Sequence, residues 1–98
     1  MRFLNITLGE VVVSRAGRDI GKKFIVTGQV DSSYVLICDG DIRKVEKPKK
    51  KKIKHLEQTG IVIEEIADKF KNKLKVTNSE IRKVISAYES KQEDESVF

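Results

Sequence analysis

The sequence predicts a mostly β fold, a small antiparallel barrel or sandwich, followed by two short helices. Residues 10–56 contain several short runs of β-branched residues bounded by turn residues, a pattern typical of small all-β domains. After Gly60 the apolar residues recur with the period of a helix, which indicates a change of secondary structure. The chain has 98 residues, room for one domain. We therefore expect a barrel in residues 1–60 and a helical tail in residues 61–98 packed on it.

The first three strands are expected at residues 10–14, 22–30 and 34–38. In the second run Phe24, Val26 and Val30 lie on one face at a period of two, as strand residues do. Gly28 interrupts this run and is a candidate for a bend. Clusters of Asp, Ser and Gly separate the runs and favour turns.

Two further strands are expected downstream of Cys38. Ile42 begins a run over residues 42–45, and residues 53–56 are the candidate for a fifth strand. Pro48 lies between them and cannot donate a hydrogen bond to a sheet. The sequence therefore places the lysine run of residues 49–52 between two strands.

The first helix is expected after Gly60. Ile63, Ile66, Ala67, Phe70 and Leu74 follow the spacing of one helical stripe. Acidic residues come early in this segment and lysines come late, an order that suits the helix dipole.

A second helix is expected to open at Thr77, because residues 77–80 form a capping-box pattern. Its apolar stripe consists of Ile81, Val84, Ile85 and Tyr88. Residues 91–96 are polar and acidic, and we expect fraying after about residue 90. Isolated helices of this length are not stable in water, so both must pack on the barrel or on each other.

Composition excludes several classes of function. One cysteine excludes a disulfide framework and a cysteine-based zinc site. The one histidine, His55, has no orienting acid at a useful spacing, so we expect no enzymatic activity, no catalytic residue, no metal site and no cofactor. The longest apolar run has five residues, whereas a membrane span needs about 20. With no secretory signal recognised, we expect a cytoplasmic protein that takes no small-molecule substrate.

Positive charge is concentrated in one part of the chain. The net charge is +5 and the isoelectric point is near 9.4. Residues 1–60 hold thirteen Lys/Arg against seven Asp/Glu, whereas residues 61–98 hold seven against eight. The window of residues 43–55 alone carries eight Lys/Arg and one acid. Such a bias points to a polyanion, a membrane surface or an acidic protein as partner.

A glycine-containing loop joins the first two expected strands. Arg15 and Arg18 lie in it beside Gly17, and Lys22 and Lys23 follow Gly21. Glycine allows positive φ and close backbone approach, and arginine binds phosphate through two parallel hydrogen bonds. The loop is therefore either a phosphate clamp or a plain hairpin with solvated charges.

The lysine run at residues 49–52 has several interpretations. It is either a solvated charge run or a phosphate-binding element. Phosphate binding is compatible with a place on a barrel edge, where lysines block pairing with other chains. A nuclear-localisation signal is disfavoured, because Ile53 and Leu56 anchor the chain directly after the run.

Residues 9–26 resemble a KOW motif, the strand–loop–strand signature of an SH3-like barrel, and Gly21 falls at its hallmark glycine. Residues 39–56 are similar to bacterial KOW-domain RNA-binding proteins related to the large-subunit ribosomal protein L-fourteen-e family, in which a lysine-rich strand and a helical tail follow the barrel. The similarity covers residues 9–56 and, to a lesser degree, residues 76–86. It implies an SH3-like barrel that binds RNA, in particular ribosomal RNA, without enzymatic activity.

The sequence therefore predicts a non-enzymatic RNA-binding protein of the ribosome, with ribosomal proteins as further partners and no membrane contact. A structured RNA is favoured over DNA because no basic recognition helix is present. Tyr34, at a turn-to-strand boundary, is the aromatic residue best placed to meet a base. The expected RNA-binding residues are Arg15, Gly17, Arg18, Gly21, Lys22, Lys23, Arg43, Lys44, Lys47, Lys49, Lys50, Lys51, Lys52, Lys54 and His55.

The alternative is a protein–protein interaction module of the transcription or translation machinery. SH3-like barrels also bind peptides, and the apolar helices could dock on a partner. Retention on heparin or bulk RNA at low salt separates the two interpretations.

Overall fold

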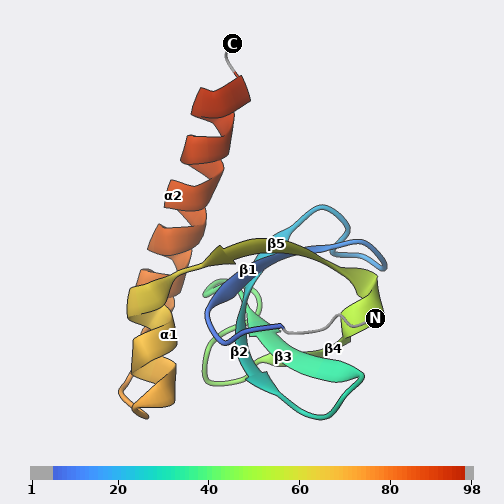
Figure 1. The fold of residues 1–98 in the computed structure, drawn as a ribbon, viewed down its shortest axis with the longest axis vertical. Helices are drawn as coiled ribbons and strands as arrows, with labels where there is room; N and C mark the ends of the chain where they lie inside the picture. The colour runs from blue at the N-terminus through green and yellow to red at the C-terminus, as the bar shows by residue number, and fades with distance from the viewer. Residues whose placement is uncertain (1–5, 97–98) are drawn as a thin grey trace.

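The computed structural model describes residues 6–96 and contains one sheet and two α-helices (Figure 1). In chain order the elements are β1 (Glu10–Ser14), β2 (Lys23–Gln29), β3 (Tyr34–Cys38), β4 (Lys49–Lys52), the 3-10 helix η1 (Ile53–His55), β5 (Leu56–Val62), α1 (Glu64–Lys71) and α2 (Asn78–Ser96). The expectation of a mostly β domain followed by two helices is confirmed.

The sheet is antiparallel throughout, with the strand order β4-β3-β2-β1-β5. It is strongly curled (Figure 1), and η1 alone connects the two edge strands β4 and β5. The register shifts between Val26 and Gly28 in β2, so the expected bend at Gly28 is confirmed. A second shift lies between Glu10 and Val12 in β1. Among the described strands β4 and β5 do not pair, so the curled sheet is not a closed hydrogen-bonded barrel.

One hydrophobic core lies on one face of the sheet, opposite the helices. It consists of Val12, Phe24, Val26, Val35, Ile37 and Leu56, with Ile6 and Ile53 packed against it. Alternation along the strands explains the membership, because successive side chains point to opposite faces of a sheet. Val12 and Phe24 are paired across β1 and β2 and both belong to this inner core.

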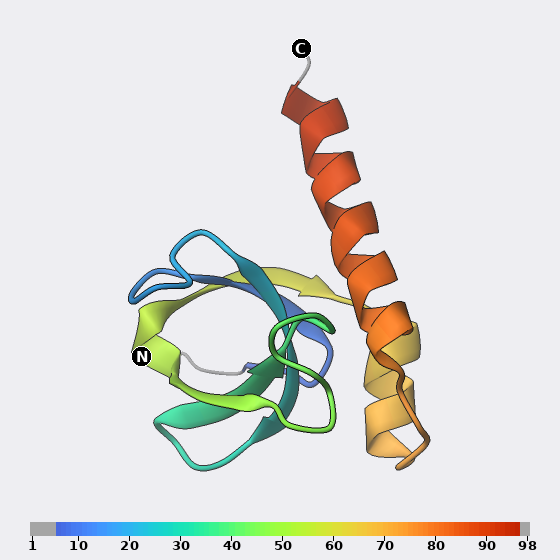
Figure 2. The ribbon, with the colours of Figure 1, turned by 180° about the vertical axis from the view of Figure 1, so that it is seen from behind.

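The second core lies on the opposite face, where the two helices cover the sheet (Figure 2). Val11, Ile25 and Cys38 supply the sheet side, and Ile66, Val76, Ile81 and Ile85 supply the helical side. This packing removes the apolar stripes of both helices from water, which short helices need in order to be stable. The described residues contain no helix with the length and apolar character needed to cross a membrane.

The second helix begins with the capping box that the sequence predicts. The Thr77 Oγ1 accepts a hydrogen bond from the Glu80 backbone N–H at 3.2 Å, and Glu80 Oε2 accepts one from the Thr77 N–H at 3.2 Å. Glu80 also pairs with Lys69 of α1. These two contacts hold the pKa of Glu80 below its usual value, with the Lys69 contact as the larger cause.

Two of the expected strands are placed wrongly. Residues 42–45 form a loop, because the Asp39 carboxylate accepts hydrogen bonds from the backbone N–H groups of Asp41 and Arg43. The fourth strand is instead the lysine run itself, Lys49–Lys52, which pairs with β3. Residues 53–55 form η1, and the fifth strand starts at Leu56.

Two details of the helical tail also differ from expectation. Helix α1 ends at Lys71, and Lys73 adopts a positive φ of 58°, so Leu74 leaves the stripe and is 58% exposed. Helix α2 continues through residues 91–96, a stretch without Gly or Pro that is rich in good helix formers. Fraying of this stretch stays a prediction.

The segment between β3 and β4, residues 39–48, is fastened to the start of α2 (Figure 2). The side chain of Asn78 accepts a hydrogen bond from the Val45 N–H at 2.7 Å and donates one to Glu46 at 2.9 Å. The Glu46 pKa is lowered, chiefly by this Asn78 contact. Arg82 Nη1 donates to the Gly40 carbonyl at 2.6 Å. The helical tail therefore fixes the course of the basic segment that leads into β4.

Candidate nucleic-acid interface

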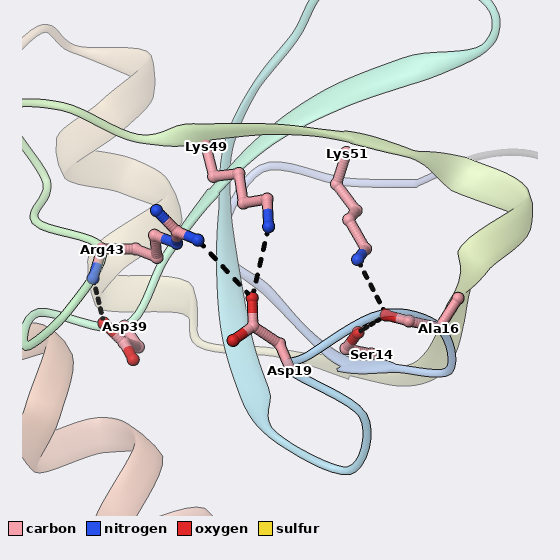
Figure 3. A network of polar contacts seen from close by, with 7 residues as sticks. All are labelled: Ser14, Ala16, Asp19, Asp39, Arg43, Lys49 and Lys51. Atoms are coloured by element: carbon pink, nitrogen blue, oxygen red, sulfur yellow. Dashed lines mark hydrogen bonds and ion pairs between the residues drawn. The ribbon is translucent and has the colours of Figure 1, made fainter.

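Two basic segments that are distant in sequence are brought together. One is the loop of residues 15–22 between β1 and β2, and the other is β4 (Figure 3). The Lys51 Nζ donates a 3.0 Å hydrogen bond to the carbonyl of Ala16, and the Lys49 Nζ lies 3.4 Å from Asp19 Oδ2. The glycine-containing loop is thus folded against the lysine strand.

Glycine and backbone hydrogen bonds give this loop its shape. Gly17 and Gly21 adopt positive φ angles of 83° and 86°, a region that glycine enters without steric cost. The Gly21 N–H donates to the Ser14 carbonyl at 2.8 Å, which closes the loop at its base. The Arg15 N–H donates to the carbonyl of His55 at 2.8 Å, so the loop is also tied to η1.

The four lysines of β4 do not share one role, because neighbouring strand residues point to opposite faces. Lys51 is buried, with 8% of its surface exposed, and Lys49 is half-buried beside it on the loop-facing side. Lys50 is exposed, and its ammonium lies 4.9 Å from the centre of the Tyr34 ring, a cation–π distance. The run therefore combines structural and solvent-facing cations.

A carboxylate lies at the centre of the contact between loop and strand. The Asp19 side chain is 13% exposed, and its Oδ2 lies 3.4 Å from Lys49 Nζ and 3.9 Å from Arg43 Nη2 (Figure 3). Two of the expected RNA-binding cations are thus paired inside the protein. Their charges are partly balanced by Asp19.

Three other expected cations also have partners. Arg15 Nη1 lies 3.2 Å from Glu57 Oε1, with both side chains more than half exposed, so the pair contributes little to stability. Lys23 points to α2 and lies 3.6 Å from Glu89. Lys44 donates to a backbone carbonyl at 2.8 Å within its own loop.

The side chains of the remaining expected RNA-binding residues have no hydrogen bond or ion pair with the part of the chain that the structure describes. These are Arg18, Lys22, Lys47, Lys52, Lys54 and His55. Arg18, Lys22, Lys47 and Lys54 are exposed, and Lys52 and His55 are half-buried. These side chains are available to a ligand without the loss of an internal hydrogen bond or ion pair.

Sequence reasoning missed Asp19 and the Ala16 carbonyl as parts of this surface. The available signal was an acid inside a loop that also holds three basic residues. Its partners lie 24 and 30 residues further along the chain, and only the pairing of the strands brings them close. The pairing of Lys50 with Tyr34 depends on the same strand register.

Metal ligation would need a cluster of His, Cys, Asp or Glu side chains, and thiol chemistry would need Cys38, whose side chain is buried. Residues 6–96 contain no group of three His, Cys, Asp or Glu side chains that could hold a metal ion. Cys38 is fully buried, and burial, helped by nearby Asp39 and Glu46, raises the pKa of its thiol to about 12. A thiol with so high a pKa is not a nucleophile near neutral pH.

No family model matches this chain. A stretch of 54 residues is 37% identical to the large ribosomal subunit protein eL14 of Desulfurococcus amylolyticus. The match covers 55% of this chain and 56% of that protein, so the chain spans about half the length of the curated relative it matches. This partial similarity supports a relationship to the ribosomal protein L14e family.

Proposed function

We propose that this chain is a non-enzymatic RNA-binding protein that associates with the ribosome in the cytoplasm and contacts ribosomal RNA. The observation that carries the proposal is the junction of the two basic segments through Lys51–Ala16 and Lys49–Asp19. The loop of residues 15–22 therefore lies against β4, so Lys and Arg residues from two distant segments of the chain are brought close together. The similarity to a protein named as a large ribosomal subunit protein favours RNA over other polyanions.

We also propose that the five strands β1 to β5 form a KOW domain with an SH3-like barrel. Three features support it: five strongly curled antiparallel strands, a glycine loop between β1 and β2, and a 3-10 helix that joins the two edge strands. Residues 1–60 would form this domain, with residues 61–98 as a helical tail packed on its outer face.

The free cations set the expected strength of binding. Six basic or imidazole side chains lack an internal partner among the described residues, and five of them are Lys or Arg. If these five and one further cation released from an internal pair neutralise about six phosphates on single-stranded RNA, log K falls with log salt at a slope of roughly −4. Affinity should then fall by two to three decades between about 50 and 200 mM salt.

A fluorescence anisotropy titration tests the proposal. The probes are a labelled fragment mixture of purified large-subunit ribosomal RNA and a random-sequence RNA of similar length, each titrated at three salt concentrations. We expect binding of both, a slope near −4, and tighter binding of the ribosomal probe. No binding of either probe at 50 mM salt would overturn the proposal.

A groove between the sheet and α2 favours a protein partner as the second candidate function. It encloses about 280 Å³, and its lining includes Ile42 and Ile85 together with charged residues of both signs. Ile42 is 62% exposed at its edge. A chain that binds no RNA but is captured by a ribosomal protein or a polymerase would support this alternative.

A further inference from the structure

The carboxylate of Asp19 contacts two cations, Arg43 and Lys49, where the loop of residues 15–22 meets β4 (Figure 3). We infer that Arg43 and Lys49 form a binding site for one RNA phosphate, and that Asp19 occupies this site in the free protein. Binding of RNA exchanges the Asp19 carboxylate for a phosphodiester oxygen. The inference rests on the proposed function and adds to it a named site and a built-in competitor.

The contacts of Asp19 are long for charged partners. Its Oδ2 lies 3.4 Å from Lys49 Nζ and 3.9 Å from Arg43 Nη2, whereas charge-assisted N–H···O bonds are typically about 2.7–2.9 Å. The carboxylate therefore neutralises the two cations without saturating their hydrogen-bonding capacity. A phosphate that approaches to the normal distance gains contacts that Asp19 does not make.

Arg43 has an unused donor at the same place. Its Nε is buried and has no hydrogen-bond acceptor among the described residues. A buried polar group without a partner is costly and rare in folded proteins. A ligand with several acceptor oxygens satisfies a guanidinium better than one distant carboxylate oxygen does, which makes Arg43 the principal phosphate contact.

The backbones of Arg43 and Lys49 are already held in place by hydrogen bonds and strand pairing. The Arg43 N–H donates to Asp39 Oδ1 at 2.9 Å, and its carbonyl accepts from the Asp39 and Gly40 N–H groups at 2.9 and 3.1 Å. Lys49 is paired with Ile37 in the ladder between β3 and β4. Only side chains and the loop of residues 15–22 need to move for the exchange. The Arg43 and Lys49 side chains are 37% and 32% exposed, so a phosphate can reach them.

An internal acid at this point has a definite consequence for selectivity. Every anion must displace Asp19 before it contacts both cations, so weak or isolated anions gain little. A polyanion that also engages the free cations Arg18 and Lys22 of the same loop offsets this cost. Asp19 therefore lowers affinity overall and raises the preference for an extended phosphate backbone.

Removal of the Asp19 charge tests the inference, because a competitor and a purely structural anchor predict opposite effects. Asp19→Asn keeps the size of the side chain and removes the charge. Asp41→Asn is the matched control: it makes the same charge change in the adjacent loop, at an exposed residue whose carboxylate has no contact among the described residues. With the labelled random-sequence RNA we expect Asp19→Asn to bind about three- to fivefold more tightly than wild type, and Asp41→Asn less than twofold.

A double-mutant cycle assigns the effect to Arg43. Arg43→Gln alone should weaken binding and make the salt slope shallower by about 0.7. Asp19→Asn should give no tightening when Arg43→Gln is also present, since coupled residues are not additive. Circular dichroism checks that each variant is folded. If Asp19→Asn does not fold, Arg43→Gln alone decides, and unchanged RNA affinity overturns the inference.

The outcomes separate this inference from the proposed function. RNA binding by wild type, with Asp19→Asn equal to Asp41→Asn or weaker than wild type, overturns the inference and leaves the proposed function standing. Failure of wild type to bind RNA overturns both. Inorganic phosphate at constant ionic strength should displace RNA no better than chloride does. Specific displacement by phosphate would assign the site to the free anion and overturn its assignment to RNA.

Discussion

The ammonium group of Lys51 is buried beneath the loop of residues 15–22, where it donates a 3.0 Å hydrogen bond to the carbonyl of Ala16. The same carbonyl accepts from Ser14 Oγ at 3.1 Å (Figure 3). A lysine within a run of four lysines therefore joins two parts of the fold. The strand alternation that buries Lys51 turns Lys50 to the opposite side.

Adjacent lysines of β4 should separate stability from RNA binding. Lys51→Gln removes a buried, charged hydrogen bond, which costs about 1–3 kcal/mol and should lower the melting temperature by several degrees or more. Lys52→Gln removes an equal charge that has no described partner. It should leave the melting temperature unchanged and make the salt slope of RNA binding shallower by about 0.7.

Thermal denaturation and RNA titrations at three salt concentrations measure both effects. Equal melting temperatures for the two variants would contradict the structural role of Lys51. Substitution of all four lysines at once would mix the two roles.

The sequence predicts the three central strands and both helices correctly, because their apolar spacing matches the period of the element. The positions of the two edge strands, β4 and β5, could not be predicted from apolar spacing. Ile42 and Val45 have high β propensity, yet the Asp39 carboxylate holds that stretch in a turn. Four lysines have a low propensity for strands and form β4 only because β3 offers a partner edge.

The candidate site could be predicted as a set of cations but not as an arrangement. The concentration of Lys and Arg is visible in the sequence, whereas the opposing acids are paired through space. Asp19 meets Lys49 across 30 residues, and Arg15 meets Glu57 across 42. The strand register and the curl of the sheet decide these pairs, and spacing along the chain carries no information about them.

The arginines of the glycine loop should supply geometry as well as charge. Arg15→Lys combined with Arg18→Lys keeps the net charge and removes the planar forks that bind phosphate with two hydrogen bonds. We expect an almost unchanged salt slope and a smaller preference for ribosomal RNA over a random pool in competition assays. Full discrimination by this variant would show that the loop acts only through its charge.

The buried thiol of Cys38 should resist modification. A pKa of about 12 leaves a thiolate fraction on the order of 10⁻⁴ at pH 8, so an aromatic disulfide reagent should react quickly only in denaturant. The pKa of this thiol in the folded protein lies above the ordinary thiol value of 9.0. The stabilising effect of the protonated thiol is therefore complete below about pH 9 and is lost as pH rises towards 12.

Lysines also titrate at high pH and change the stability of the protein. Comparison of wild type with Cys38→Ala isolates the contribution of the Cys38 thiol, because the lysines are the same in both. The difference in melting temperature between wild type and Cys38→Ala should narrow between pH 9 and pH 11. A constant difference across that range, or rapid labelling of the native protein at pH 8, would contradict burial of the thiol.

The helical tail should matter to the fold more than to RNA contact, because residues 61–98 carry one more acid than base. Truncation after Ser90 removes no residue of either core, and we expect unchanged RNA affinity. Truncation after Val62 uncovers Val11, Ile25 and Cys38 and should cause aggregation or a much lower melting temperature. A large loss of RNA affinity in the shorter deletion, with the circular dichroism of the sheet intact, would assign an RNA contact to the end of α2.

Gly40 should be highly sensitive to substitution, because two independent constraints meet there. Its φ is 79°, and an added Cβ would lie 2.4 Å from the Asn78 carbonyl oxygen and 3.1 Å from the Cγ of Arg82. Gly60 is the matched control, since it has a nearly equal φ of 78° and open space around the added atom. Gly60→Ala should cost about 1–2 kcal/mol from backbone strain alone, and Gly40→Ala should cost about 1–3 kcal/mol more through the steric overlap.

Urea unfolding of the two variants measures the difference. Because Gly40 and Asn78 hold residues 39–48 against α2, relief of the overlap must shift the loop that carries Arg43. Gly40→Ala should therefore also weaken RNA binding at temperatures where it is folded, whereas Gly60→Ala should not. Equal stability of the two variants would mean that α2 yields to the added methyl group. Equal RNA affinity, with Gly40→Ala clearly the less stable variant, would mean that the tail supports the sheet without positioning the basic loop.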